Sequence, residues 1–193
     1  MFVYSSFFEW VLHRYIMHDD RFMKYAHEAH QLLHHDIFRA DATYFLNKEI
    51  HTKEAESHLT FAWWNAPLLI GMHLPFFVGF WFLGAMTAGW VGGIVATVFS
   101  FSAIVSYYAL YEYLHYCMHV PGNRWFERTK FFNYVQNHHR LHHVYYKKNL
   151  NVVIPIADFI LGSMVRLEDP AIFDKLEAVR QRRTERSTQG AAA

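Results

Sequence analysis

The feature that most constrains this chain is the grouping of its histidines. Residues 138–143 read His-His-Arg-Leu-His-His, so four imidazoles fall within six positions. On a helix, His139, His142 and His143 are spaced i, i+3 and i+4, which places three ring nitrogens on one face. The spacing therefore predicts that these three rings lie close enough to share a metal ion.

Three further clusters repeat the pattern elsewhere in the chain. They are His13 with His18, His30 with His34 and His35, and His115 with His119. Twelve of the fifteen histidines lie in the two regions that hold these clusters. Ordinary surface or core histidines would be scattered, so the clustering at helical ligand spacing indicates metal coordination.

A second constraint is the segregation of charge along the chain. Hydrophobic residues make up 53% of the chain and charged residues only 18%. The 55 positions between Glu56 and Glu112 contain no Asp, Glu, Lys or Arg. Because about 20 apolar residues cross the hydrocarbon core of a bilayer, this stretch predicts two spanning helices, at about 61–82 and 92–111.

The expected fold is all-α, a single domain that covers residues 1–193. A membrane hairpin leaves and re-enters the bilayer by the same face, so both histidine-bearing regions would form a helical cap on one side. All Lys and Arg residues lie outside the hairpin, which makes that side cytoplasmic by the positive-inside rule. We expect an integral, multi-pass membrane protein with a cytosol-facing dimetal site.

The two ends of the chain carry further expectations. Residues 1–18 predict a helix, at the interface or at the end of a membrane helix, that delivers His13 and His18 at its wet end. A basic tail, residues 169–193, is expected to be helical through about Arg183. It would form a solvated or headgroup-facing surface and no nucleic-acid site, and its arginines are Arg180, Arg182, Arg183 and Arg186.

The number of histidines bears on the metal. Cys117 is the only cysteine, which excludes a thiolate cluster. About ten clustered imidazoles are too many for one ion and suit two ions with four to six ligands each. A paired metal centre at a membrane surface suits attack on a lipid. Water and proton-transfer groups cannot oxidise an unactivated C–H bond of a lipid, whereas a redox metal with dioxygen can. Iron is therefore the metal that we expect.

The order His-x4-His, His-x3-His-His, His-x3-His, His-x2-His-His resembles the fatty acid hydroxylase / sterol desaturase superfamily of membrane-bound non-haem di-iron oxygenases, over about residues 8–165. The resemblance implies a lipid substrate, O2 as cosubstrate and an external electron donor, a b-type cytochrome or a ferredoxin with its reductase. It implies two iron ions, which zinc can replace in a purified sample, and no catalytic residue beyond the ligands. The implied ligands are His13, His18, His30, His34, His35, His115, His119, His139, His142 and His143.

Several choices within this resemblance stay open. His27 precedes His30 by three residues, so either could lead the second motif, although we favour His30. His138 and Asn151 are candidates for a supporting place around the ligands. The first motif, residues 13–18, looks like that of carotenoid ring hydroxylases. The run over residues 149–162 is more similar to the fatty acid hydroxylase group, which we favour.

Other functions remain as alternatives. A lipid desaturase would share the first steps of hydroxylation and differ in the fate of the substrate carbon. A non-catalytic b-type haem protein needs facing histidine pairs on spanning helices, but only His73 lies within a predicted span. A zinc or other metal carrier is the third possibility and predicts a readily exchanged metal with no oxygen consumption.

Overall fold

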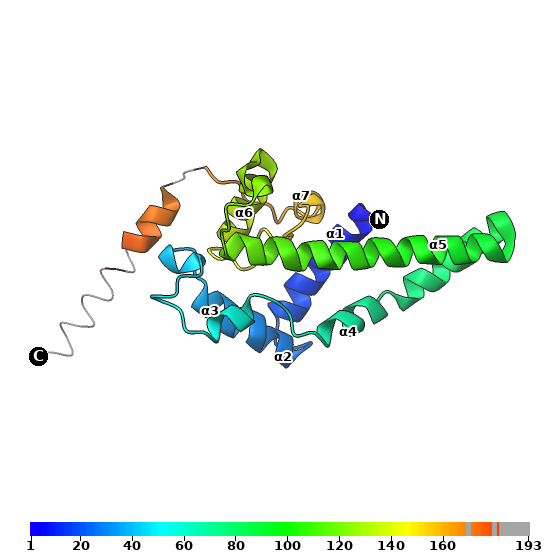
Figure 1. Ribbon diagram of the computed structural model, residues 1–193, viewed down its shortest axis with the longest axis horizontal. Helices are drawn as coiled ribbons and strands as arrows, with labels where there is room; N and C mark the ends of the chain where they lie inside the picture. The colour runs from blue at the N-terminus through cyan, green and yellow to red at the C-terminus, as the bar shows by residue number, and fades with distance from the viewer. Residues whose placement is uncertain (169–170, 179–180, 182–193) are drawn as a thin grey trace, which may run out of the picture.

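The computed structural model describes residues 1–168, 171–178 and 181. Regular secondary structure in these residues consists of helices, without a strand, as the all-α prediction requires. Figure 1 shows a cap of short helices from which a long pair of helical arms projects to one side. The N-terminus lies beside the base of the arms.

The chain begins with α1 (Phe2–Val11), which runs directly into η1 (Leu12–Met17). The helix predicted over residues 1–18 is therefore present, but its last turns are π-helical. α1 packs against α7 (Ile156–Ile160). Its buried residues are polar, namely Ser5, Ser6 and Glu9, whereas Phe2 and Val3 are exposed.

A second helical rod follows, in three consecutive parts: α2 (Lys24–His27), η2 (Glu28–His34) and α3 (His35–Ile37). Its middle part is again π-helical. The chain then crosses a loop with two short 3₁₀ turns, η3 (Ala42–Tyr44) and η4 (Ala55–His58). This loop lies between the rod and the long arms and carries backbone carbonyl groups to the histidines.

The long arms are formed by α4 (Asn65–Gly71) and α5 (Leu74–His119). The first predicted span, 61–82, is thus not one continuous helix: helix begins at Asn65 and is interrupted at Met72 and His73. The physical reason is Pro75 at the start of α5. Proline has no N–H to donate to the Gly71 carbonyl four residues earlier, and its ring would clash with that carbonyl, so one α-helix cannot continue through this position.

α5 reverses direction within the turn that the sequence predicts between the spans. Ala88 has φ −140° and Gly89 has φ 64°, so neither is helical. The positive φ at Gly89 is a conformation that residues with a Cβ rarely adopt. The two arms approach closely beyond the turn, because a Cβ added to Gly84 would meet the Gly92 carbonyl oxygen.

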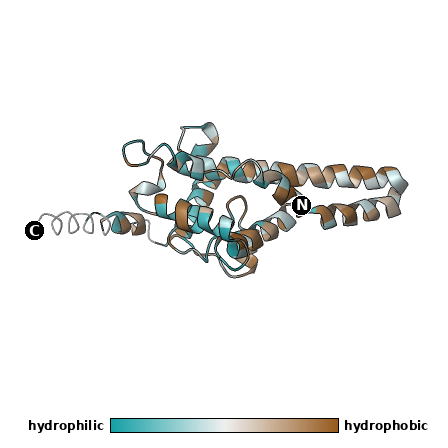
Figure 2. Ribbon diagram, turned by 90° about the horizontal axis from the view of Figure 1, so that it is seen from below, coloured by the Kyte–Doolittle hydropathy of each residue, from teal (hydrophilic) through white to brown (hydrophobic). Residues whose placement is uncertain are grey.

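The arms carry apolar side chains on their outer surface. Met86, Trp90 and Phe99 expose 85%, 71% and 65% of their surface, and Figure 2 shows the arms as mostly hydrophobic. Among the described residues, α5 is the one helix that is long and apolar enough to cross a membrane, and 17% of its most apolar window is buried. Such exposure is unusual for a monomer in water.

The cap is completed by η5 (Trp125–Arg128), α6 (Lys130–His142) and α7. Its main core joins the returning arm of α5 to α6 and to the segment before α7. Fully buried members of this core include Cys117, Met118, Val135 and Val152. The core holds the ends of α5 and α6 side by side, and these two ends carry five of the histidines.

Little of the predicted basic tail can be compared with the structure. Residues 172–178 are helical, and Phe173 packs under the Arg140 guanidinium, which lies 3.9 Å from the ring centroid. The four tail arginines lie outside the described residues. They are Arg180, Arg182, Arg183 and Arg186.

Candidate metal centre

The first histidine pair is brought together by the π-helical turn of η1. His13 and His18 are five residues apart, and at 3.6 residues per turn an α-helix would direct them about 140° apart. Here the His18 N–H donates to the His13 carbonyl oxygen at 3.1 Å, the i to i+5 bond of a π-helix. The two rings stack with centroids 5.0 Å apart.

The second motif repeats this device in η2. The backbone N–H of His35 donates to the His30 carbonyl oxygen, again over five residues. The His30 and His35 rings then face one another, with their Nε2 atoms 3.2 Å apart. Isolated π turns inside helices occur often at functional sites. In this chain both of them place a histidine pair in the same cluster.

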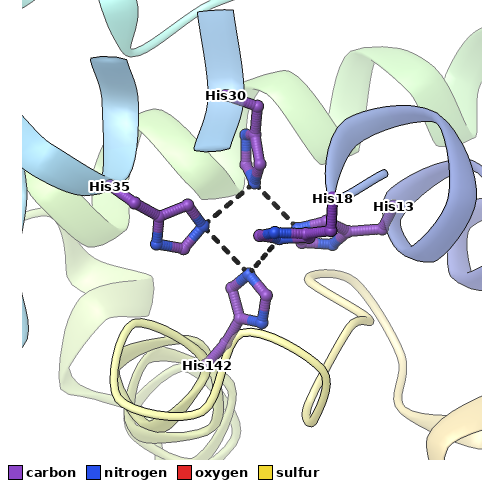
Figure 3. Close-up of side chains that lie close together, drawn as sticks. All are labelled: His13, His18, His30, His35 and His142. Carbon is purple, nitrogen blue, oxygen red and sulfur yellow. Dashed lines mark hydrogen bonds between the residues drawn. The ribbon is translucent and has the colours of Figure 1, made fainter. Parts of the chain in front are cut away.

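Five histidines from three parts of the chain converge on one point, which we call group A (Figure 3). Each offers one ring nitrogen, and these nitrogens all lie within 4.8 Å of one another. The closest pair is His13 Nε2 and His30 Nε2, at 2.9 Å. Group A consists of His13, His18, His30, His35 and His142.

Four more histidines form group B directly beside it. His139 Nε2 lies 3.2 Å from His119 Nε2 and 3.1 Å from His143 Nε2. The two groups adjoin, because the His35 and His143 ring centroids are 4.2 Å apart. Group B consists of His34, His119, His139 and His143.

His115 lies at the edge of group B. Its ring centroid is 4.8 Å from those of both His34 and His139. The His115 Nε2 atom is buried and has no hydrogen-bond partner, and the same holds for His34 Nε2. A buried imidazole nitrogen without a partner is costly, so both atoms fit ligands of an ion. All ten histidines of the four motifs therefore lie in or beside the two groups.

The structure corrects one expectation about the motifs. His139, His142 and His143 do not converge on a single point, since His142 belongs to group A and the other two to group B. Likewise His34 joins group B, whereas its neighbour His35 joins group A. The two motifs that end in adjacent histidines, His34-His35 and His142-His143, thus each contribute one ring to group A and one ring to group B.

The second ring nitrogen of most of these histidines is held by an oxygen acceptor. In group A, His13 Nδ1 donates to the Leu150 carbonyl at 2.5 Å and His142 Nδ1 to the Lys148 carbonyl at 2.8 Å. His18 Nδ1 donates to the side-chain oxygen of Gln31. Because these oxygens can only accept, Nδ1 carries the proton and Nε2 keeps a free lone pair.

Backbone carbonyl groups from the loop between α3 and α4 play the same part in and beside group B. The acceptors are Phe38 for His143, Tyr44 for His119, His58 for His34 and Leu59 for His115. These bonds orient each ring and direct its Nε2 inward, as they commonly do for metal-binding histidines. The long loop thus acts as a scaffold for group B.

The resulting lone pairs require a cation between them. His18 Nε2 lies 3.0 Å from His142 Nε2, yet both rings carry their proton on Nδ1. Two lone pairs at this distance repel unless a proton or a metal ion lies between them. A proton is disfavoured, because burial lowers the pKa of His18 to about 4 and that of His142 well below its ordinary value. The geometry and the all-nitrogen donor set therefore fit metal ions.

The same burial acts throughout both groups. It lowers the pKa of His115 to about 4, and for the remaining members it drives the pKa well below 6.5. Neighbouring imidazoles lower it further. The rings are therefore neutral at physiological pH and available as ligands. The eight whose pKa lies well below its ordinary value are His13, His30, His34, His35, His119, His139, His142 and His143.

The three alternative residues lie outside the two groups. His27 is absent from both, and His30 takes its place in group A. His138 Nε2 contacts the buried Asp158 carboxylate at 3.0 Å, and this carboxylate also accepts from the backbone N–H groups of Leu150 and Asn151. Asp158 thereby fixes the segment whose Leu150 carbonyl holds His13.

Asn151 contributes to the same support from the other side. Its Nδ2 donates to the Ser6 carbonyl at 2.8 Å and to the Glu9 carboxyl at 3.2 Å, which fastens this segment to α1. The Glu9 carboxyl is fully buried, and desolvation raises its pKa to about 7. None of the hydrogen bonds that Asn151 makes involves one of the ten histidines. Asn151 thus acts on His13 through the backbone segment that carries the Leu150 carbonyl.

A large cavity borders both groups. It has a volume of about 540 Å³ and lies between η2 and α4, so we call it the η2–α4 cavity. His30 of group A, His34 of group B and His115 line one end of it. Some of the residues that line the cavity are also exposed at the surface, namely Met23, Tyr25 and Leu68. The cavity therefore opens at the surface between α2 and α4.

Gln31 is a site residue that the sequence analysis did not identify. It directly follows a ligand candidate, but a single glutamine inside a helix has no distinctive signal. The carbonyl acceptors have no sequence signal at all, since every residue carries a backbone carbonyl.

Comparison of the chain with known protein families, with characterised proteins and with solved structures finds no match.

Proposed function

We propose that this protein is an integral membrane oxygenase that hydroxylates an unactivated C–H bond of a lipid at a pair of histidine-bound iron ions. The observation that carries the proposal is that groups A and B adjoin each other and border the same η2–α4 cavity. The order of the histidine motifs, which resembles that of the fatty acid hydroxylase / sterol desaturase superfamily, supports the same function.

The ten histidines would hold the metal, with group A around one ion and group B with His115 around the other. A pair of redox ions, when bound, supplies the activation of dioxygen that no side chain can provide. Zinc binds the same ligands, so purified protein can carry zinc in place of iron.

The reaction consumes one O2, two electrons and two protons, breaks one C–H bond, and yields one C–OH group and one water. The electrons come from an external carrier, a b-type cytochrome or a ferredoxin with its reductase. The chain binds the apolar substrate in the η2–α4 cavity and keeps water from the reacting carbon. The carbonyl-held rings keep the ligand set fixed in place during turnover.

The membrane location rests on three features of the surface. The arms expose large apolar side chains, and the chain lacks charged residues between Glu56 and Glu112. α1 also turns polar residues inward and apolar residues outward, as helices in lipid do. We propose that the arms of α4 and α5 insert into the bilayer as a hairpin, with the histidine cap on the cytoplasmic side.

Isotope labelling tests the proposed reaction. Membranes that contain the protein, iron, an electron donor with its reductase and a lipid extract are incubated with ¹⁸O2, and lipid products are analysed by mass spectrometry. We expect a lipid that has gained one ¹⁸O atom. His142→Ala should abolish the product, whereas His51→Ala, outside both groups, should retain it.

The same experiment separates the other functions. A desaturase would yield a product that lacks two hydrogens and contains no ¹⁸O, and a carotenoid ring hydroxylase would label the carotenoid fraction. A metal carrier or a haem protein would yield no oxidised lipid with any donor. Wild-type activity of His142→Ala would contradict the assignment of the ligands.

A further inference from the structure

The η2–α4 cavity has a distinctive distribution of polarity. Its wall is mostly apolar, with Leu12, Met17, Leu59, Leu69 and Met72 among the lining side chains. At about 540 Å³ it lies within the range of small-molecule sites, roughly 300–1,000 Å³. The cavity is therefore large enough to enclose a medium-length acyl chain or a ring system.

The charged groups on the wall are of one sign. Besides histidines, the lining residues include Glu28 and Glu112. No Lys or Arg lines the cavity in the part of the chain that the structure describes. Glu112 Oε2 accepts a hydrogen bond from the Phe61 N–H at 3.0 Å, which holds the carboxyl at the wall.

This distribution penalises an anion inside the cavity. A carboxylate or phosphate that leaves water needs a partner of opposite charge, and the wall supplies carboxyl groups instead. The only positive charge would be that of the metal ions. An acid that used it would place its head, and not a C–H bond, against the histidines.

We propose that the η2–α4 cavity binds a lipid whose enclosed polar group is uncharged, such as a hydroxyl, ester or amide, and discriminates against lipid acids. Only the identification of this lipid as the substrate rests on the proposed oxygenase function. The binding preference itself follows from the wall of the cavity and requires no turnover.

A matched pair of ligands tests the preference. Dodecanoic acid and methyl dodecanoate differ in charge and share the same chain. The full-length metal-loaded protein is placed in phosphatidylcholine nanodiscs at pH 8, and each ligand displaces a fluorescent dodecyl probe. We expect the ester to bind at least about tenfold more tightly than the acid. Leu69→Trp, which fills the cavity, should weaken the binding of both ligands.

The variants Glu112→Gln and Glu28→Gln remove the two negative charges one at a time. Glu112→Gln retains an oxygen that can accept from the Phe61 N–H, and Glu28 is exposed, so neither change removes a required contact. We expect each variant to gain affinity for the acid several-fold, with ester affinity unchanged. Comparing variants in the same nanodiscs cancels the different partitioning of the two ligands into lipid.

Two results would overturn the proposal. One is equal affinity of wild-type protein for acid and ester, and the other is an acid affinity that neither substitution changes. If the binding preference is found but no ¹⁸O-labelled product forms, the oxygenase function fails and the ligand class stands. If labelled product forms from a lipid acid enclosed in this cavity, the oxygenase function stands and the proposed ligand class fails.

Discussion

At the scale of single residues, the site depends on which ring nitrogen carries the proton. Seven of the ten histidines donate Nδ1–H to an oxygen, and this leaves Nε2 free to bind a metal. In six of the seven the acceptor is a backbone carbonyl. The seventh is His18, whose acceptor is the side chain of Gln31. That difference makes His18 the ligand most open to mutational test.

Replacing Gln31 by leucine should weaken the binding of one metal ion. The change removes the acceptor of His18 Nδ1–H, and loss of such a partner commonly costs about 10–100-fold in metal affinity. Titration with a chelator, followed by metal analysis, should show one labile ion and one that is still tightly held. Gln31→Glu keeps an oxygen acceptor and should restore tight binding. Two equally stable ions in Gln31→Leu would argue against the role of Gln31.

Two neighbouring histidines in the second motif provide a matched comparison. His30 is in group A, whereas His27, three residues earlier on the same rod, is in neither group. We expect His30→Ala to lose one metal ion per chain and His27→Ala to keep the wild-type content, as measured by plasma mass spectrometry. Metal loss in His27→Ala with retention in His30→Ala would reverse the assignment.

Acid should destabilise the chelator-treated protein. Burial lowers the pKa of His18 and His115 to about 4, so these rings stay neutral in the folded chain while they take up protons in the unfolded chain below pH 6.5. The unfolded state then binds more protons, and stability decreases as pH falls from about 6.5 to about 4. Glu9 and Glu112, each with its pKa raised to about 7, act in the opposite direction but are two groups against ten histidines.

Denaturant unfolding at a series of pH values measures this dependence. Bound metal should delay the loss of stability to lower pH, because protons must then displace the ion. If the free energy of unfolding of the metal-free protein stays constant or increases as pH falls from 6.5 to 4, that result would contradict the burial of neutral rings.

At the scale of elements, the sequence predicted the helices better than their internal geometry. The predicted helix with His139 and His142 is a regular α6 that His143 ends as C-cap, and Thr129 accepts the Phe132 N–H at its start. The π turns of η1 and η2 were not predicted, because a periodicity of 3.6 residues places i and i+5 on different faces. The spacing of five residues in two motifs was the only sign of them.

The division of each double-histidine motif between two groups was also hidden from the sequence. Ligand spacing along one helix says which rings can meet, whereas the positions of η2, α5 and α6 decide which rings do meet. The carbonyl acceptors of group B depend on the loop between α3 and α4, which has no regular pattern. The hairpin turn at Ala88 and Gly89 was predictable, because glycines interrupt an uncharged stretch at that point.

The close packing of the two arms predicts a difference between two glycines of α5. A Cβ at Gly84 would meet the Gly92 carbonyl oxygen and lie 2.8 Å from the Ala96 Cβ, whereas a Cβ at Gly79 meets nothing within 4 Å. We expect Gly84→Ala to destabilise the protein by about 1–3 kcal/mol, because the arms must separate. Gly79→Ala should be neutral or slightly stabilising.

Thermal unfolding in nanodiscs measures both glycine variants. Equal effects of the two substitutions on stability would contradict the close packing of the two arms at Gly84.

At the scale of the whole molecule, an apolar hairpin and a polar cap meet at the η2–α4 cavity. The predicted hairpin and cap follow from charge segregation, which is visible in the sequence over residues 57–111. The convergence of histidines from both ends of the chain follows from the packing of α5 against α6 and of α1 against α7. Neither the cavity nor its carboxyl-lined wall could be read from motif spacing.

The central claim is that the ten histidines bind two metal ions. The most direct test is metal analysis of protein purified from iron-replete cells, combined with X-ray absorption spectroscopy at the iron edge. We expect two ions per chain, each surrounded by imidazole nitrogen, without sulfur neighbours. Protein that is active but contains one ion or none, or ions whose neighbours are mainly sulfur, would contradict the claim.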